Sequence, residues 1–398
     1  MKPRVLIVNK FYYPRGGDCV CTLNLERLLK LNGHEVAVFA MHYPENLPSR
    51  YDRYFATNVD FAGGVGNKLR ALRRMLGYGD VRKSFSRMLD DFKPDVVHLN
   101  NIHSYLSPVL AELAHIRGCK VVWTLHDYKL LCPSYSCLCR GQVCEACFQD
   151  KTQVVRRHCM RDSIIASIIA YIEALVWNRK RLERTVDVFI CPSQFMANKM
   201  MDGGFDNDKI KVICNFVDSD KLSEFQKNSN CNREDYYCYV GRLSSEKGIA
   251  TLLDVASQKT FKLKVAGDGP IGEALKLKYS QCANIEFLGH CDANRVGELL
   301  SHARFSVLPS EWYENNPLGI IESLCGGTPV VGSKIGGIAE LIDEATGVLF
   351  SSGNREDLSA AIQQAWERDW DYEAIAVAAQ RKFAPEQHYI KLSKIYSA

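Results

Sequence analysis

The sequence lacks the features that would place it inside a membrane or on nucleic acid. Its longest apolar run, residues 164–177, is interrupted by Ser167 and Glu173 and is too short to span a bilayer. No apolar run of signal-peptide length follows residues 1–10, so we expect a cytoplasmic location. The net charge of +4 is mild for 398 residues and does not indicate a nucleic-acid partner.

The composition is that of a folded globular protein. Apolar residues make up 46% and charged residues 24% of the chain. A chain of 398 residues is too long for one comfortable hydrophobic core, so two domains are expected. In a reducing compartment the 16 cysteines are not expected to form a disulfide framework.

Short runs of Val, Ile and Leu alternate with helical stretches along the whole chain. The strands expected first are residues 4–8, 35–40, 95–99, 120–125 and 186–191. A second series comprises residues 236–240, 262–266, 285–288, 304–308 and 328–331, and residues 209–213 are either its first strand or a linker. Continuous apolar strands separated by helices predict parallel sheets buried on both faces, hence an α/β fold with two doubly wound, Rossmann-like domains.

The expected N-terminal domain covers residues 1–205 and contains a cysteine-rich insertion at residues 132–159. The expected C-terminal domain covers residues 206–380, and a helix at residues 381–398 is expected to pack back on the N-terminal domain. Ligands of open α/β sheets bind beyond the carboxyl ends of the strands, so functional residues should follow strands.

Two glutamates follow one of the expected strands, separated by seven residues. Glu314 lies in a polar loop, and Glu322 lies in a helix opened by Pro317-Leu318-Gly319. Such a helix start offers unpaired N–H groups and a partial positive charge, which suit an anion. Acidic pairs at this spacing are common, so the pair alone does not establish a site.

Arg242 and Lys247 flank the loop after the strand at residues 236–240. Two cations beside a helix start suit a diphosphate, although a solvated basic turn would have the same residues.

In the first half of the chain, Gly16-Gly17 lies between a strand and a helix, and His126-Asp127 follows another strand. Glycine permits close approach of the backbone to a ligand, and histidine can orient a substrate or carry a proton. The alternatives are an ordinary tight turn and a structural histidine. A further polar cluster at a strand end comprises His98, Asn100, Asn101 and His103.

Taken together, these motifs resemble the retaining glycosyltransferases of family 4, which have the GT-B fold, over nearly the whole chain. The motifs that carry the resemblance are Glu314-x7-Glu322 with Asn315-Asn316-Pro317-Leu318-Gly319 between, Gly241-Arg242 with Lys247-Gly248, Gly16-Gly17, His126, Asn215-x-Val217-Asp218 and Phe383-Ala384-Pro385-Glu386. The family usually has glycine where this chain has Phe216. The resemblance implies two domains facing a central cleft.

The resemblance also implies roles for single residues. Arg242 and Lys247 would neutralise the diphosphate of a nucleotide-sugar donor, and Gly16 and Gly17 would let the N-terminal domain approach it. Glu322 would accept hydrogen bonds from the ribose hydroxyls. Glu314 would contact the transferred sugar, with help from backbone amides of the loop formed by Asn316, Pro317, Leu318 and Gly319. His126 would lie near the anomeric carbon.

The implied reaction is retaining transfer of a sugar, with a UDP-sugar as the expected donor. The acceptor hydroxyl attacks the face that the diphosphate leaves, and no metal cofactor is required; no Asp-x-Asp pair is placed to hold one. The expected setting is synthesis of a surface polysaccharide. Two alternatives stay open: another GT-B enzyme, such as a nucleotide-sugar epimerase or a phosphorylase, and a non-enzymatic scaffold.

Six cysteines crowd residues 132–159, and Cys144-Glu145-Ala146-Cys147 is a C-x2-C motif. Tetrahedral zinc often takes two ligands from such a motif and two from elsewhere. The preferred ligand set for a structural zinc ion is Cys132, Cys144, Cys147 and Cys159, with Cys137 and Cys139 as extras. A group of reduced thiols and an iron–sulfur cluster are the alternatives.

Residues 68–89 interleave basic with apolar side chains. The basic residues are Lys68, Arg70, Arg73, Arg74, Arg82, Lys83 and Arg87. Such a segment suits the surface of an anionic membrane, and a solvated helix face is the alternative. Because the N-terminal domain binds the acceptor in the family, this patch would hold a glycan or a polyprenyl-diphosphate-linked acceptor at the inner leaflet. Residues 164–177 are expected to form a buried helix.

Overall fold

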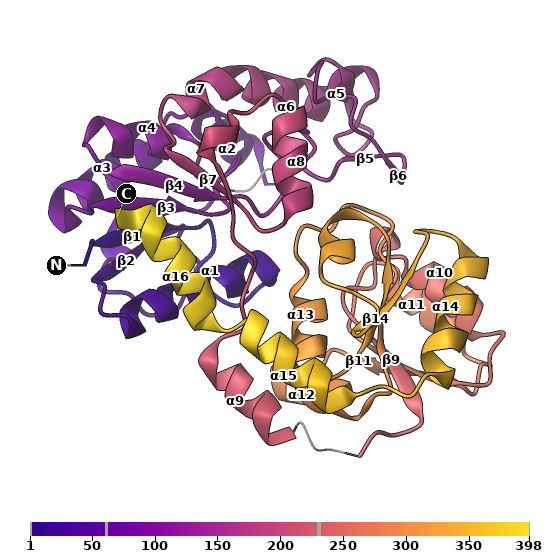
Figure 1. The fold of residues 1–398 in the computed structure, drawn as a ribbon. Coiled ribbons are helices and arrows are strands. Elements are labelled where there is room, and N and C mark those ends of the chain that lie inside the picture. The colour runs from indigo at the N-terminus through magenta and orange to yellow at the C-terminus, as the bar shows by residue number, and fades with distance from the viewer. Residues whose placement is uncertain (1, 60–62, 229–231, 398) are drawn as a thin grey trace. The chain divides into compact units, whose positions relative to one another are not determined.

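The computed structural model describes residues 2–59, 63–228 and 232–397, which fall into two compact units (Figure 1). One unit comprises Met1–Arg140, Cys144–Cys214 and Tyr389–Ala398, and the other comprises Gly141–Val143 and Asn215–His388. Each unit contains a six-stranded sheet in which the paired strands run parallel, so the expected pair of Rossmann-like α/β domains is confirmed.

The sheet of the N-terminal unit has the strand order β2-β1-β3-β4-β7-β8. Its strands are β1 (Val5–Val8), β2 (Val36–Phe39), β3 (Val96–Leu99), β4 (Lys120–Thr124), β7 (Val188–Cys191) and β8 (Ile210–Val212). All four side chains of β1 are fully buried, as expected for an interior strand of a parallel sheet that is covered on both faces.

The helices of this unit are α1 (Gly17–Leu31), α2 (Val65–Met75), α3 (Asp80–Phe92), α4 (Val109–Ile116), α5 (Gln153–Arg156), α6 (Ile164–Val176), α7 (Arg179–Glu183) and α8 (Gln194–Asp202). Two short strands, β5 (Leu138–Cys139) and β6 (Gln142–Val143), lie in the cysteine-rich insertion. Every helix within the described residues is too short or too polar to cross a lipid bilayer.

The strand at residues 209–213 belongs to the first sheet, not to the second series. β8 pairs in parallel with β7, with Ile210 opposite Phe189 and Val212 opposite Cys191. A short edge strand has the same kind of local sequence whichever sheet it joins, so the sequence pattern could not decide between the two sheets.

The sheet of the C-terminal unit has the strand order β11-β10-β9-β12-β13-β14. Its strands are β9 (Tyr236–Val240), β10 (Lys262–Ala266), β11 (Ile285–Gly289), β12 (Ser306–Leu308), β13 (Val330–Ser333) and β14 (Gly347–Phe350). The helices are α9 (Ser219–Asn228), α10 (Ile249–Ala256), α11 (Gly272–Lys278), α12 (Ala293–His302), α13 (Leu318–Cys325), α14 (Arg355–Glu367) and α15 (Tyr372–Lys382). The last helix, α16 (Pro385–Ser397), begins in this unit and continues in the N-terminal unit. The sequence analysis missed β14 and placed β13 two residues early.

The last ten residues of the chain belong to the N-terminal unit. Here the hydroxyl of Tyr389 is 3.0 Å from Nε2 of His34, and the hydroxyl of Tyr396 bonds to Nδ1 of His98. His98 also contacts Thr124 through its other ring nitrogen, so this histidine ties α16 to the first sheet and has no nitrogen left for a ligand.

Candidate active site

In the C-terminal unit, the loops that follow neighbouring strands are joined by backbone hydrogen bonds. The amide of Leu243, after β9, donates to the carbonyl of Asp268, after β10, at 2.9 Å. The amide of Gly337, after β13, donates to the carbonyl of Glu314, after β12, at 2.7 Å. The carboxyl ends of these strands therefore form one fixed surface, where ligands of such sheets bind.

Two glycines make the close approach of these loops possible. Gly248 has φ +66°, and a Cβ atom there would lie 1.8 Å from the carbonyl oxygen of Pro309. Gly267 has φ +134°, and a Cβ atom there would lie 1.9 Å from the carbonyl oxygen of Gly241. Neither position admits a side chain, so the sequence fixes how the β9 loop contacts its neighbours on both sides.

Lys247 and Glu314, both predicted from the sequence, meet at this surface. The Lys247 ammonium lies 2.6 Å from Oε1 of Glu314. The same oxygen accepts hydrogen bonds from the Ser310 hydroxyl at 2.7 Å and from the indole N–H of Trp312 at 2.9 Å. Glu314 is buried, so these three donors hold its carboxylate in one orientation.

Arg242 lies on the same loop as Lys247 but is largely exposed. Its guanidinium donates to the carboxylate of Glu246, which also accepts a hydrogen bond from Ser244. Burial alone would raise the pKa of Glu246, but the donors of Ser244 and Arg242 outweigh burial and lower the pKa. The loop thus presents two cations, one exposed and one paired with a buried acid.

Glu322 projects from α13, whose first turn has no side-chain cap. Its carboxylate lies 2.6 Å from the Lys221 ammonium of α9. The first N–H groups of a helix have no partner inside the helix, and Gly319 is exposed with nothing within 4 Å of a Cβ atom built on it. The start of α13 is therefore open to an acidic group, as the sequence predicted.

Asn316 has a structural partner that the sequence analysis did not predict. The Asn316 side-chain oxygen accepts a hydrogen bond from the backbone N–H of Asn215 at 2.9 Å. The Asn215 side chain in turn donates to the backbone carbonyl of Asn316 at 2.8 Å. The adjacent Phe216, which departs from the family pattern, is buried with its ring centroid 4.5 Å from that of His388. These residues anchor the β12 loop to the first residues of the C-terminal unit.

In the N-terminal unit, Gly16 and Gly17 start α1 with no steric reason to be glycine. A Cβ atom on Gly17 would meet nothing within 4 Å, and Gly16 has an extended backbone that any residue adopts. Asp18, in the first turn of the helix, accepts a hydrogen bond from the Asn101 side chain at 2.7 Å. The missing side chains leave the backbone accessible, while Asp18 already places one negative charge at this helix start.

His126 is oriented by the same group of residues. Its Nε2 lies 3.0 Å from the side-chain oxygen of Asn100. Burial lowers the pKa of His126, although the carboxylates of Asp18 and Asp127 oppose this shift. The neutral ring then donates from Nε2 to Asn100 and leaves Nδ1 as an acceptor.

Asp18 is the residue of this group that the sequence analysis did not identify. The signal was present, because an acidic residue directly after Gly16-Gly17 is unexpected at a helix start proposed to bind an anion. His103, by contrast, is buried against the ring of Trp123, with centroids 5.1 Å apart. Burial lowers the pKa of His103 to about 3, so it remains neutral in the core.

The cysteine-rich insertion brings its thiols into two groups. Hydrogen bonds from Cys137 and Cys147 lower the pKa of the Cys132 thiol. Cys159 contacts Cys139 and is also close to Cys132 and Cys144. Cys137 and Cys139, which were expected to be extras, therefore lie within the cluster. No three His, Cys, Asp or Glu side chains in the described part of the chain are arranged to hold a metal ion.

The basic segment at residues 68–89 is divided by the structure into exposed and buried cations. Arg74 is fully buried, and its guanidinium donates to the Thr57 carbonyl and to Asp80. Arg70 and Arg73 are exposed, and they line an open pocket of about 380 Å³ together with Leu69 and Tyr78. Arg74 is thus a structural residue and not part of the surface patch.

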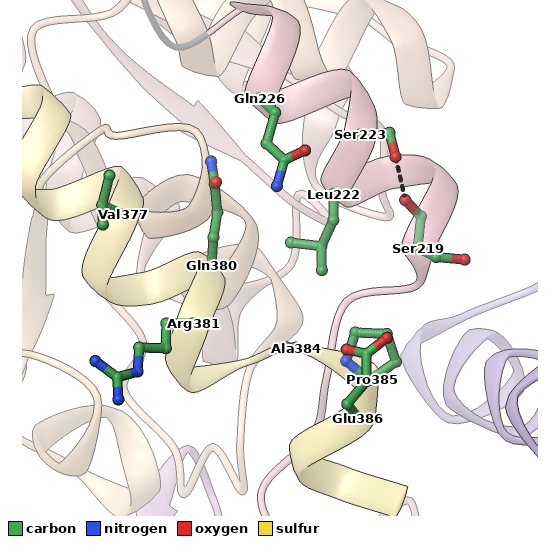
Figure 2. A pocket seen from close by; sticks show the side chains of 10 residues that line it. All are labelled: Ser219, Leu222, Ser223, Gln226, Val377, Gln380, Arg381, Ala384, Pro385 and Glu386. Atoms are coloured by element: carbon green, nitrogen blue, oxygen red, sulfur yellow. Dashed lines mark hydrogen bonds between the residues drawn. The ribbon is translucent and has the colours of Figure 1, made fainter.

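A second pocket, of about 390 Å³, lies between α9 and α15 of the C-terminal unit. Figure 2 shows Leu222 and Gln226 of α9 facing Gln380 of α15 across it. Gln380 donates to the carbonyl of Cys325 at 2.8 Å, so its amide has a structural partner. None of the strand-end loops lines this pocket, and we do not assign it to the site.

Two family models match the chain in tandem. The model of Glycosyltransferase Family 4 matches residues 15–221, and the model of Glycosyl transferases group 1 matches residues 220–382. The chain is 26% identical over 352 residues to an uncharacterized 42.6 kDa protein in the cps region of Klebsiella pneumoniae, covering 85% of this chain and 87% of that one.

Two further comparisons concern named proteins. The chain is 28% identical over 211 residues to the O-antigen biosynthesis glycosyltransferase WbnH of Escherichia coli, covering 52% of this chain and 59% of that protein. Its fold matches the crystal structure of Anabaena Alr3699/HepE in complex with UDP and glucose, with a TM-score of 0.67 and 18% identity over 99% of both chains. The fold is GT-B, and the chain belongs to glycosyltransferase family 4.

Proposed function

We propose that this chain is a retaining glycosyltransferase that moves a sugar from a nucleotide-diphosphate sugar to a hydroxyl of a glycan or lipid-linked acceptor in surface polysaccharide synthesis. The observation that carries the proposal is the Lys247–Glu314 pair, held by Ser310 and Trp312 beside the open start of α13. This arrangement offers a cation for phosphate oxygens and a fixed carboxylate for sugar hydroxyls.

The proposed roles are those that the resemblance to family 4 implies, and the charges of the residues suit them. Arg242 and Lys247 bind the diphosphate. Glu322 accepts hydrogen bonds from the ribose hydroxyls, and Glu314 accepts them from hydroxyls of the transferred sugar. During the reaction the bond between the anomeric carbon and the diphosphate oxygen breaks, and a bond to the acceptor oxygen forms. The acceptor proton passes to the departing diphosphate, whose growing negative charge the fixed cations stabilise without reorganisation.

In the N-terminal unit, Gly16 and Gly17 are proposed to contact the diphosphate through their backbone, and His126 to contact the sugar or the acceptor through Nδ1. The absence of any intramolecular reason for Gly17 to be glycine supports this role. A UDP-sugar is the proposed donor, because HepE was crystallised with UDP and glucose. We propose that the protein acts at the cytoplasmic face of the inner membrane.

The pocket on α2 is proposed to receive the acceptor. Arg70 and Arg73 supply positive charge, and Leu69 and Tyr78 supply apolar surface, within one hollow of about 380 Å³. A polyprenyl diphosphate has the same two components, an anionic head and an apolar chain. Arg74, being buried, has no part in this role.

A donor screen tests the proposed function. Thermal unfolding is measured with UDP-, GDP-, dTDP- and ADP-sugars, since a ligand at a hundred times its dissociation constant stabilises by about 2.7 kcal/mol. One nucleotide class is expected to raise the midpoint, and proton NMR of the product is expected to show the donor's anomeric configuration retained. Donor consumption without an acceptor, or inversion at the anomeric carbon, would contradict the proposal.

We also propose that binding of a structural zinc ion draws Cys132, Cys144, Cys147 and Cys159 together from the arrangement described above, in which they are not placed to coordinate a metal. Their thiolates are the donors zinc prefers, and the contact of Cys132 with Cys147 supports the choice. Protein purified without added zinc is expected to contain stoichiometric metal, which Cys147→Ser should lose and Cys282→Ser, in the other unit, should keep. Metal-free protein whose cluster thiols all titrate would exclude the site.

A further inference from the structure

Helix α6 exposes its apolar residues and buries its polar ones. Its exposed side chains are Ile164, Ile165, Ile168, Ile172 and Leu175. At 100° per residue these five lie within an arc of about 100° on one side of the helix. Ile165 is 69% and Ile164 51% exposed, which is unusual for neighbouring aliphatic residues of a folded domain. We call this surface the α6 stripe.

The opposite side of α6 is held against the domain by polar contacts. The buried Glu173 carboxylate accepts from the amide and hydroxyl of Ser104 and lies 2.9 Å from the Lys129 ammonium. The buried Ser167 hydroxyl accepts from the Met160 amide at 3.1 Å. These bonds fix the rotation of the helix, so the α6 stripe cannot turn inward. The expectation of a buried helix is therefore wrong for one face.

The ends of the α6 stripe are strongly basic. The segment from residue 156 to residue 184 contains seven Lys and Arg residues against three acidic ones. Arg156, Arg157 and Arg161 precede the helix, and Arg179, Lys180 and Arg184 follow it, all exposed. One of the acids, Glu173, is buried and paired, so it does not offset the charge at the surface.

We propose that the α6 stripe docks this glycosyltransferase on an anionic lipid surface. The aliphatic side chains enter the boundary between head groups and acyl chains, and the flanking cations contact the lipid phosphates. This inference rests on the proposed function only for the purpose of docking, which is to bring the enzyme to a lipid-linked acceptor. Lipid binding itself is measured separately from sugar transfer.

Charge argues against a second copy of the chain as the occupant. Two α6 helices packed face to face would bring basic ends together whether they ran parallel or antiparallel, since both ends carry cations. Like charges placed opposite one another oppose association. The stripe also lacks Trp, Tyr and Met, which protein interfaces favour. An anionic lipid surface satisfies both the charge and the aliphatic character.

Vesicle sedimentation of the full chain tests the proposal. Phosphatidylcholine vesicles with phosphatidylglycerol should bind the wild type, and vesicles of phosphatidylcholine alone should bind it weakly. The Ile168→Gln/Ile172→Gln variant should bind the anionic vesicles about tenfold less. The matched control is Leu277→Gln/Val377→Gln, which replaces two exposed apolar residues of the C-terminal unit and should bind as the wild type does.

Arg179→Gln/Lys180→Gln should also weaken binding and reduce its dependence on salt. Unchanged midpoints of thermal unfolding are expected for these variants, because the replaced side chains are exposed. Equal binding by Ile168→Gln/Ile172→Gln and wild type would overturn the proposal. So would a wild-type dimer that this variant converts to a monomer.

Transfer to a water-soluble acceptor analogue separates this proposal from the proposed function. Ile168→Gln/Ile172→Gln should keep wild-type transfer to that analogue and lose transfer to an acceptor embedded in vesicles. Absence of any transfer by the wild type would reject the proposed function and leave the vesicle result standing by itself.

Discussion

Lys247→Ala is expected to lower sugar transfer about a thousandfold while leaving a folded protein. The ammonium is one of two cations on the loop after β9 and the one already oriented by a buried carboxylate, at 2.6 Å from Glu314. Removing a preorganised group that stabilises developing charge typically costs a factor of about 100 to 1,000. Initial rates with saturating donor and acceptor measure the loss.

The same substitution affects stability, and a second variant separates the two effects. Without Lys247, the buried Glu314 carboxylate keeps the Ser310 and Trp312 donors but loses its paired cation, which should cost about 1–3 kcal/mol of unfolding free energy. Adding Glu314→Gln removes the uncompensated charge, so the double variant should regain stability without regaining activity. Urea unfolding measures the free energy of unfolding of both variants.

Lys276→Ala is the matched control for Lys247→Ala. Lys276 also pairs with a glutamate, Glu273, at 2.8 Å, but on an exposed face of α11. This variant should retain transfer and change stability by about 0–1 kcal/mol. Transfer at the wild-type rate by folded Lys247→Ala protein would remove Lys247, and with it the assigned donor site, from the proposal.

The sequence was sufficient to predict which loops carry the proposed site. Polar residues after β9 and β12 had to meet, because neighbouring parallel strands end at the same edge of a sheet. The pairing of Lys247 with Glu314 was not predictable, since it depends on how closely two loops approach. That approach is set by Gly248 against the Pro309 carbonyl, a contact between residues 61 positions apart.

Two interpretations were wrong for part of their segment, because they depended on the average character of that segment. Residues 68–89 alternate basic and apolar side chains, and nothing in that alternation separates the buried Arg74 from the exposed Arg73. Residues 164–177 are apolar nearly throughout, so the pattern has no preferred face. The few polar residues set the orientation of this helix, because Glu173 pairs with Lys129 and Ser104 inside the domain.

Gly248→Ala is expected to lower transfer about as much as Lys247→Ala does, through a change in the backbone instead of the loss of a charge. Gly248 ends the short helix η3 (Ser245–Lys247) with φ +66° and begins α10. A Cβ atom there would lie 1.8 Å from the Pro309 carbonyl oxygen, so the β9 loop must move away from the β12 loop. Lys247 and Glu314 stand on those two loops and would separate.

The cost in unfolding free energy should be about 3 kcal/mol, from the strained backbone and the collision with a carbonyl that cannot rotate away. Gly297→Ala is the matched control. Gly297 lies inside α12 with nothing within 4 Å of a built Cβ atom, so alanine there should stabilise by about 0.5–1 kcal/mol and leave transfer unchanged. If Gly248→Ala were as stable and active as Gly297→Ala, the contact between the two loops would not be what positions Lys247.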